Sequence, residues 1–196
     1  MASGLEHAAN RARTANIITS LARSITLFLT VFVGALPSSA LASDPADRVI
    51  AVVDGELVLS SEVDLVAAVT EQDPSASRFW TRPVRNNAQR ATDAAIVRAS
   101  AGDVSLYAPT AAEVRERSTA IRRSFDSAIE ADAWLAAWGL QGERLDEQVI
   151  GRLVVEKFLA RTLPVAESDP GWDTAVDALL DELRDARRIR RIGEQR

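Results

Sequence analysis

The sequence predicts a mainly α-helical domain with a small β-hairpin and sheet, and three observations support this class. The first is a helical stretch over 143–163 that is too apolar around its circumference to lie on a surface. The second is a series of segments with start signals such as Thr110 and stop glycines such as Gly139. The third is a β-branched run over 49–53, followed by an Asp-Gly turn signal. We expect a helical bundle around the apolar stretch, with a small sheet that joins the N- and C-terminal segments.

The first 42 residues have the features of a secretory signal peptide. Arg11, Arg13 and Arg23 precede an uncharged apolar run over 25–36, and Ala40-Leu41-Ala42 provides an A-x-A ending. We expect export and cleavage after Ala42. The alternative is a membrane anchor that stays in place, but this apolar run is shorter than the ~20 residues that span a bilayer.

Removal of that peptide would leave one domain, 43–196, of 154 residues, which is enough for one compact core. We expect an N-terminal part over 43–163, a short connector, and a returning helix and strand over 169–192. The formal charge is −5 for the whole chain and −7 without residues 1–42, which hold three arginines and one glutamate. An acidic, exported chain is a poor candidate for nucleic-acid binding.

The composition also argues against catalysis. The only histidine, His7, lies in the expected signal peptide, and the chain has no cysteine. The domain would therefore lack a Ser-His-Asp triad, a cysteine nucleophile and any His- or Cys-ligated zinc site. Two carboxylate pairs remain, Glu62 with Asp64 and Asp173 with Asp177, but acids near helix starts usually serve as caps and dipole partners. We expect no enzyme activity, no cofactor and no metal.

The domain opens with a hairpin and a helix. The run over 49–53, the turn Asp54-Gly55 and the apolar run after it predict two antiparallel strands. Ser60-Ser61 then supplies an N-cap for a helix to about Thr70. The segment 71–77 is rich in turn-forming residues, which predicts a loop.

Two further helices are expected from their end signals. The segment 84–101 has only a thin apolar strip, most of it alanine, and Gly102 ends it. Thr110 and Glu113 form a capping-box pattern that opens a helix to about Arg123.

The next helix is expected over 126–138. It places Trp134 and Trp138 at i,i+4 and Ile129 on another side, and Gly139 is its expected stop. Because the loop that follows is short, we expect this helix to pack against the helix over 143–163.

The central helix, over 143–163, has apolar residues over more than half of its circumference. They include Leu145, Val149, Ile150, Leu153, Val154 and Phe158. Arg152 and Glu156 remain as a narrow polar seam at i,i+4, so neighbouring helices must enclose the rest. Gly151 costs about 1 kcal/mol relative to Ala and is typical of a place where another backbone comes close.

A last helix and strand follow Pro164. Asp169-Pro170 resembles an N-cap with proline at the first helical position, and an amphipathic stripe follows it. The stripe consists of Val176, Leu179, Leu180 and Leu183. The segment 188–192 is predicted to form a short strand that completes the hairpin sheet. Its arginines have two interpretations, contact with anionic lipid or acidic protein, or a solvated helix end.

In this order, four segments resemble SurA-type periplasmic folding factors. They are DRVIAVVDGELVLSSEVD, ATDAAIVRASAGDVSLYAPTAAEV, FDSAIEADAWLAAWGL and ERLDEQVIGRLVVEKFL. They are similar to the opening strand–turn–strand–helix of the family, to its second and third helices, and to the final helix pair of its N-domain. The resemblance covers most of 47–163 and implies a SurA N-domain-like helical bundle.

Members of that family usually carry one or two parvulin prolyl-isomerase domains before a returning C-terminal helix. Here only 165–168 separates the central helix from the last one, and the parvulin active-site histidines have no counterpart. The resemblance therefore implies a periplasmic chaperone-like protein without isomerase activity. Its implied partners are unfolded exported polypeptides, among them outer-membrane β-barrel precursors.

The candidate peptide-binding residues are the largest aromatic side chains, which offer wide contact area and a polar handle. They are Trp80, Tyr107, Trp134, Trp138 and Trp172. Two interpretations stay open, since these residues either line a groove between helices or pack inside the domain. Two functions also stay open: a chaperone that holds unfolded clients, or a non-catalytic structural subunit of a cell-envelope complex.

Overall fold

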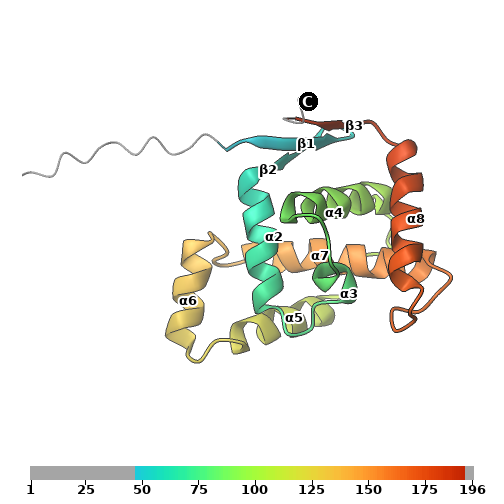
Figure 1. The fold of residues 1–196 in the computed structure, drawn as a ribbon. Helices are drawn as coiled ribbons and strands as arrows, with labels where there is room; N and C mark the ends of the chain where they lie inside the picture. Colours follow the sequence, from blue (N-terminus) through green and yellow to red (C-terminus); the bar gives the residue numbers. More distant parts are fainter. Residues whose placement is uncertain (1–46, 193–196) are drawn as a thin grey trace, which may run out of the picture. The chain divides into compact units, whose positions relative to one another are not determined.

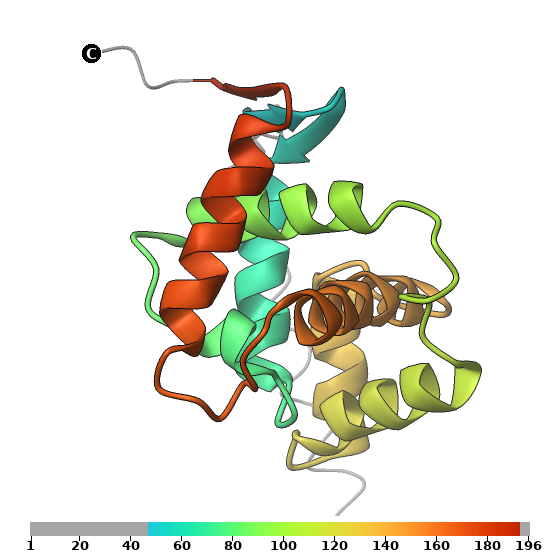
Figure 2. The ribbon, with the colours of Figure 1, turned by 90° about the vertical axis from the view of Figure 1, so that its right-hand side faces the viewer.

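The computed structural model describes residues 47–192. The predicted signal peptide and its cleavage site lie outside the described residues. The described part is mainly α-helical with one three-stranded antiparallel sheet (Figures 1 and 2), which confirms the predicted fold class. Within 47–192, no helix is both long enough and apolar enough to cross a membrane.

The elements of this part follow one another with short connections. In chain order they are β1 (Val49–Val53), β2 (Glu56–Leu59), α2 (Ser60–Gln72), α3 (Arg78–Thr81), α4 (Asn87–Ala101), α5 (Ala111–Arg123), α6 (Ala128–Ala137), α7 (Arg144–Thr162), α8 (Trp172–Asp185) and β3 (Ile189–Arg191).

The sheet has the strand order β2-β1-β3, so the hairpin and the last strand pair through β1. Asp54 and Gly55 both have positive φ, as a two-residue hairpin turn requires. On the other edge of β1, the main-chain N–H of Ile192 donates to the carbonyl of Ile50 at 3.0 Å. The predicted return of the final strand to the hairpin is confirmed.

The start of α2 differs from the prediction. The helix begins at Ser60, with Leu59 as an N-cap that makes no side-chain bond. The hydroxyls of Ser60 and Ser61 instead donate to the carboxylate of Asp47, which β-pairing brings alongside. These bonds, that of the Ser61 hydroxyl first, lower the pKa of Asp47.

The segment between α2 and α4 also departs from expectation. Residues 78–81 form the short helix α3, which places Phe79 and Trp80 in the core. The next helix begins at Asn87 rather than Val84, because the side chain of Asn86 caps it by accepting from the N–H of Gln89 at 2.9 Å.

Helix α4 is more central than its sequence indicates. Every residue over 91–97 is buried, and α4 packs against α2, α7 and α8 and against the sheet (Figure 2). The expected thin strip is wrong because alanine offers little contact area but lets neighbouring elements approach on every side. Even Thr92 and Asp93 are buried here.

Helix α7 is enclosed as predicted over most of its length, and Leu145, Val149 and Leu159 are buried. Ile150 is the exception in the predicted apolar arc, with an exposed fraction of 41%. The predicted close backbone at Gly151 is wrong as well. An added Cβ there would meet the side-chain Cδ of Arg98 at 3.6 Å, which is ordinary contact.

The starts and stops of the remaining helices follow the signals with two shifts. Helix α6 begins at Ala128 rather than Asp126, because the side chain of Ser127 caps it by accepting from the N–H of Glu130. The capping box of Thr110 and Glu113 is present, and Gly139 ends α6 with φ +65°. Helix α8 begins at Trp172, two residues beyond the predicted Pro170, because the Asp169 carboxylate accepts from the N–H of Gly171 and holds a turn.

Candidate functional site: a buried ion network, a pocket and an exposed helix

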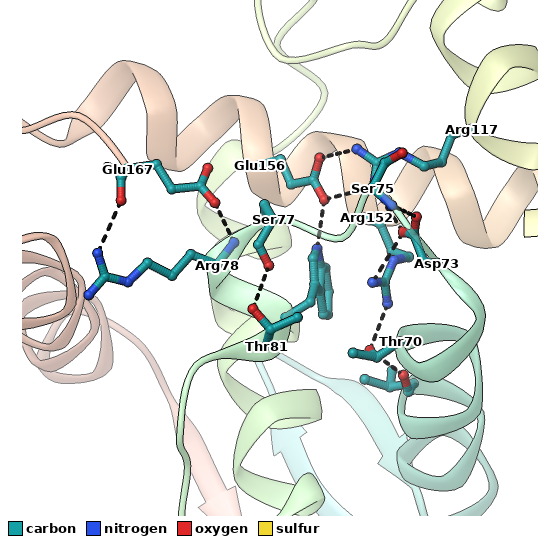
Figure 3. A network of polar contacts seen from close by, with 12 residues as sticks. Thr70, Asp73, Ser75, Ser77, Arg78, Thr81, Arg117, Arg152, Glu156 and Glu167 are labelled. Atoms are coloured by element: carbon teal, nitrogen blue, oxygen red, sulfur yellow. Dashed lines mark hydrogen bonds and ion pairs between the residues drawn. The ribbon is translucent and has the colours of Figure 1, made fainter. Parts of the chain in front are cut away.

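The polar seam of α7 meets two other helices in a buried ion network (Figure 3), which consists of Asp73, Arg117, Arg152 and Glu156. Arg117 lies between the two carboxylates, with Nη1 2.8 Å from Asp73 Oδ2 and Nη2 2.9 Å from Glu156 Oε2. Nη2 of Arg152 lies 3.4 Å from the same oxygen of Asp73. Two cations and two anions balance one another, which is the usual condition for burying charges.

Trp80 completes this network from α3. Its indole N–H donates to Glu156 Oε1 at 3.0 Å, and the guanidinium of Arg152 lies 4.1 Å from the ring centroid. Trp80 is 1% exposed. The tryptophan therefore acts as a core residue with a satisfied polar tip and a cation above its face.

Burial shifts the pKa values of Arg152 and Glu156, and their ion pairs oppose these shifts. Desolvation lowers the pKa of Arg152 to about 10, so its guanidinium stays protonated at neutral pH. Desolvation raises the pKa of Glu156, because burial also disfavours the charged form of a carboxyl group, and the nearby Arg117 opposes this shift. For Arg117 desolvation acts downward, but Glu156 and Asp73 outweigh it and raise its pKa. The network joins α2, α3, α5 and α7 electrostatically.

A pocket of about 250 Å³ lies on the side of the network where Glu156 sits. We call it the Trp172 pocket. It is formed by α7, the N-terminal end of α3, and the loop that leads into α8. Its lining residues include Ser77, Glu156, Leu159, Val165, Glu167 and Trp172.

A second pocket of about 260 Å³ lies between α2, α4 and α7. Val66, Val69 and Trp80 form its apolar part, while Arg98 and Glu62 belong to its polar lining. These two charges already pair at 2.9 Å. The second pocket is also lined by Glu147 and Arg152, so its lining carries charges of both signs, whereas the charged residues of the Trp172 pocket are carboxylates alone.

Helix α6 lies at the edge of the described part (Figure 1) and combines a buried face with an apolar exposed face. Ala131 and Leu135 are buried. Ile129 on the outer side is 81% exposed, and Trp138 at the end of the helix is 37% exposed. The other exposed residues of the helix are Ala128, Ala133, Ala136 and Ala137 and the two acids Glu130 and Asp132.

The five predicted peptide-binding aromatics lie in separate places. Trp80 belongs to the ion network, and Trp172 is buried but lines the pocket named after it. Tyr107 packs against Phe158, with ring centroids 5.2 Å apart.

Only Trp134 and Trp138 lie together, with ring centroids 6.4 Å apart, and Trp134 also contacts Phe125. The aromatics therefore do not form one continuous groove. The sequence did not point to Ile129 or Glu167 as surface or pocket residues. The apolar composition of the 126–138 segment could have identified the first, whereas the loop position of Glu167 gave no signal.

Within residues 47–192, no group of three or more His, Cys, Asp or Glu side chains could hold a metal ion. Comparisons with known protein families, with curated proteins and with solved structures found no match for this chain. The family resemblance of the sequence thus stays a prediction.

Proposed function

We propose that this protein is an exported, non-catalytic binder of unfolded polypeptides. It would act in the periplasm as a chaperone-like module without isomerase activity, and outer-membrane protein precursors would be among its clients. The observation that supports this function best is the exposed apolar side of α6.

A helix that is mainly apolar normally lies inside a protein or against a partner. Helix α6 has only two charged residues, Glu130 and Asp132, yet it lies at the edge of the described part (Figure 1). Its outer face holds Ile129 and three exposed alanines, while the partly exposed Trp138 follows the last turn on another side of the helix. Large apolar side chains exposed on a mainly apolar helix are typical of interaction sites.

The expected strength of such a contact suits transient holding. Burial of one large apolar side chain contributes roughly 1.5–3 kcal/mol, before the loss of freedom on binding is subtracted. Contacts through Ile129 and Trp138 would therefore be weak and reversible. A client would leave this surface as it folds, without an energy source such as ATP.

Aggregation assays with several unrelated unfolded proteins test this function. We expect the wild type to slow their aggregation and the double variant Ile129→Ser, Trp138→Ser to lose most of that effect. The control is Leu106→Ser, because Leu106 is 52% exposed in the loop after α4, far along the chain from α6. Equal effects of the wild type and the double variant would refute the role of α6.

The alternative is a structural subunit of a cell-envelope complex, which the same α6 face would also serve. A subunit would bind one partner stoichiometrically and would leave unrelated unfolded clients unprotected. Pull-downs with the wild type and the double variant, compared with the aggregation assays, separate the two functions.

A further inference from the structure

We propose that the Trp172 pocket takes the side chain of a lysine from a bound polypeptide. The inference rests on the proposed function, since it names a feature of the polypeptide that would bind. It is argued from the walls of the pocket, its charges and its size.

The walls of the pocket are apolar and suit the stem of a lysine. Leu159 from α7, Val165 from the following loop and the ring of Trp172 all contribute to the lining. Long cationic side chains bury their methylene groups along surfaces of this kind and keep the charged end at a polar site.

The charged residues of the lining are both carboxylates, Glu156 and Glu167. Glu156 is already compensated, because it pairs with Arg117. The nearby guanidinium of Arg78 is engaged as well, with Nη2 2.5 Å from Asp173 Oδ2.

Glu167 is the carboxylate that remains for a ligand. It accepts a hydrogen bond from the main-chain N–H of Arg78, and within residues 47–192 it belongs to no ion pair. Its own main-chain carbonyl accepts from the Arg78 guanidinium at 3.1 Å, which holds the loop in place (Figure 3). An incoming ammonium would therefore meet a fixed, uncompensated negative charge beside an apolar wall.

The size of the pocket favours one side chain over a free ligand. Sites for small molecules usually enclose about 300–1,000 Å³. The Trp172 pocket, at about 250 Å³, is smaller. A lysine fits better than an arginine, since one compact charge needs no planar two-point partner.

Two labelled peptides test the inference on the protein without the predicted signal peptide, residues 1–42. They share an aromatic-rich sequence and differ at one central position, which is lysine in one and uncharged norleucine in the other. In low-salt fluorescence anisotropy, we expect the lysine peptide to bind about fivefold more tightly, as for a partly exposed ion pair. NMR should show a larger shift of the Trp172 indole N–H with the lysine peptide.

The variant Glu167→Gln keeps the acceptor for the Arg78 N–H and removes the charge. We expect it to bind both peptides with the affinity of the norleucine peptide for the wild type. The matched control is Glu116→Gln, which removes one negative charge from the exposed face of α5, and it should keep the fivefold preference.

The outcomes separate this inference from the proposed function. Equal binding of the two peptides to the wild type would overturn the lysine site and leave polypeptide binding intact. An equal loss of preference in both variants would also overturn it, since the effect would then come from net charge. If neither peptide binds, the proposed function fails first and the lysine site with it.

Discussion

At the residue scale, Asp73 connects several buried elements through its side-chain contacts. Its side chain is fully buried, and its Oδ2 lies near both Arg117 and Arg152. Its other oxygen accepts from the N–H of Ser75 at 3.0 Å and shapes the turn after α2. The sequence places Asp73 in a loop, where carboxylates are usually solvated, and only the packing of α5 and α7 shows its role.

We expect Asp73→Asn to destabilise the protein by about 3–5 kcal/mol, because it leaves two buried guanidinium groups with one carboxylate. The asparagine keeps the acceptor for Ser75, so the loss reports the charge. As control, Asp132→Asn removes a carboxylate that is 77% exposed and pairs with the 41% exposed Arg122, and it should cost at most about 1 kcal/mol. Urea unfolding of both variants measures this, and similar values for the two would contradict the role of the network.

At the scale of single elements, the C-terminal end of α6 is set by hydrogen bonds between residues that are close in sequence. The N–H of Gly139 donates to the carbonyl of Ala136, and that of Leu140 donates to the carbonyl of Leu135 at 2.7 Å. These are the two bonds of a Schellman motif, and Leu135 and Leu140 belong to the same core cluster. The Gly-Leu pair in the sequence is sufficient to predict this stop.

Two glycine substitutions should therefore have opposite effects. Gly139→Ala places a side chain at φ +65° and should lower the free energy of unfolding by about 1–2 kcal/mol. Gly151→Ala lies inside α7, where the added Cβ makes ordinary contact with Arg98, and should raise it by up to about 1 kcal/mol. Thermal and urea unfolding of each variant gives the comparison. A stabilising Gly139→Ala would contradict the assigned helix stop.

On the scale of the whole described part, contacts between distant segments complete the fold. β3 joins the sheet beside β1, and α8 lies against α4 (Figures 1 and 2). Asp93 of α4 is buried and lies 2.7 Å from Arg184 of α8 and 3.5 Å from Arg82. The returning C-terminal segment is therefore held by both main-chain pairing and buried charge.

Hydrogen exchange tests this closure directly. The amide of Ile192 donates to Ile50, and that of Asp54 donates to Arg188 at 3.2 Å. We expect both amides to exchange at least about tenfold more slowly than in an unstructured chain, because exchange requires the strands to separate. The exposed Val104, in the loop after α4, serves as a fast-exchanging reference. Equal rates at all three positions would contradict the pairing of β3.

The sequence alone determined the fold class and the order of all elements except the short helix α3, because the signals involved are local. Hairpin turns, capping boxes and stop glycines such as Asp54-Gly55, Thr110 and Gly139 act over a few residues, and the apolar arc of α7 is a property of one segment. Even the return of the final strand followed from its β-branched pattern and the unpaired hairpin.

Only the tertiary structure decided which residues are buried, which are exposed and which distant residues lie together. It buried an alanine-rich helix on every side, left Ile129 of an apolar helix exposed, and put Glu167 beside Trp172. These outcomes depend on which distant segments approach one another, and no local pattern encodes that approach. The physical reason is that burial and charge compensation are properties of a neighbourhood in space, whereas the sequence specifies neighbours along the chain.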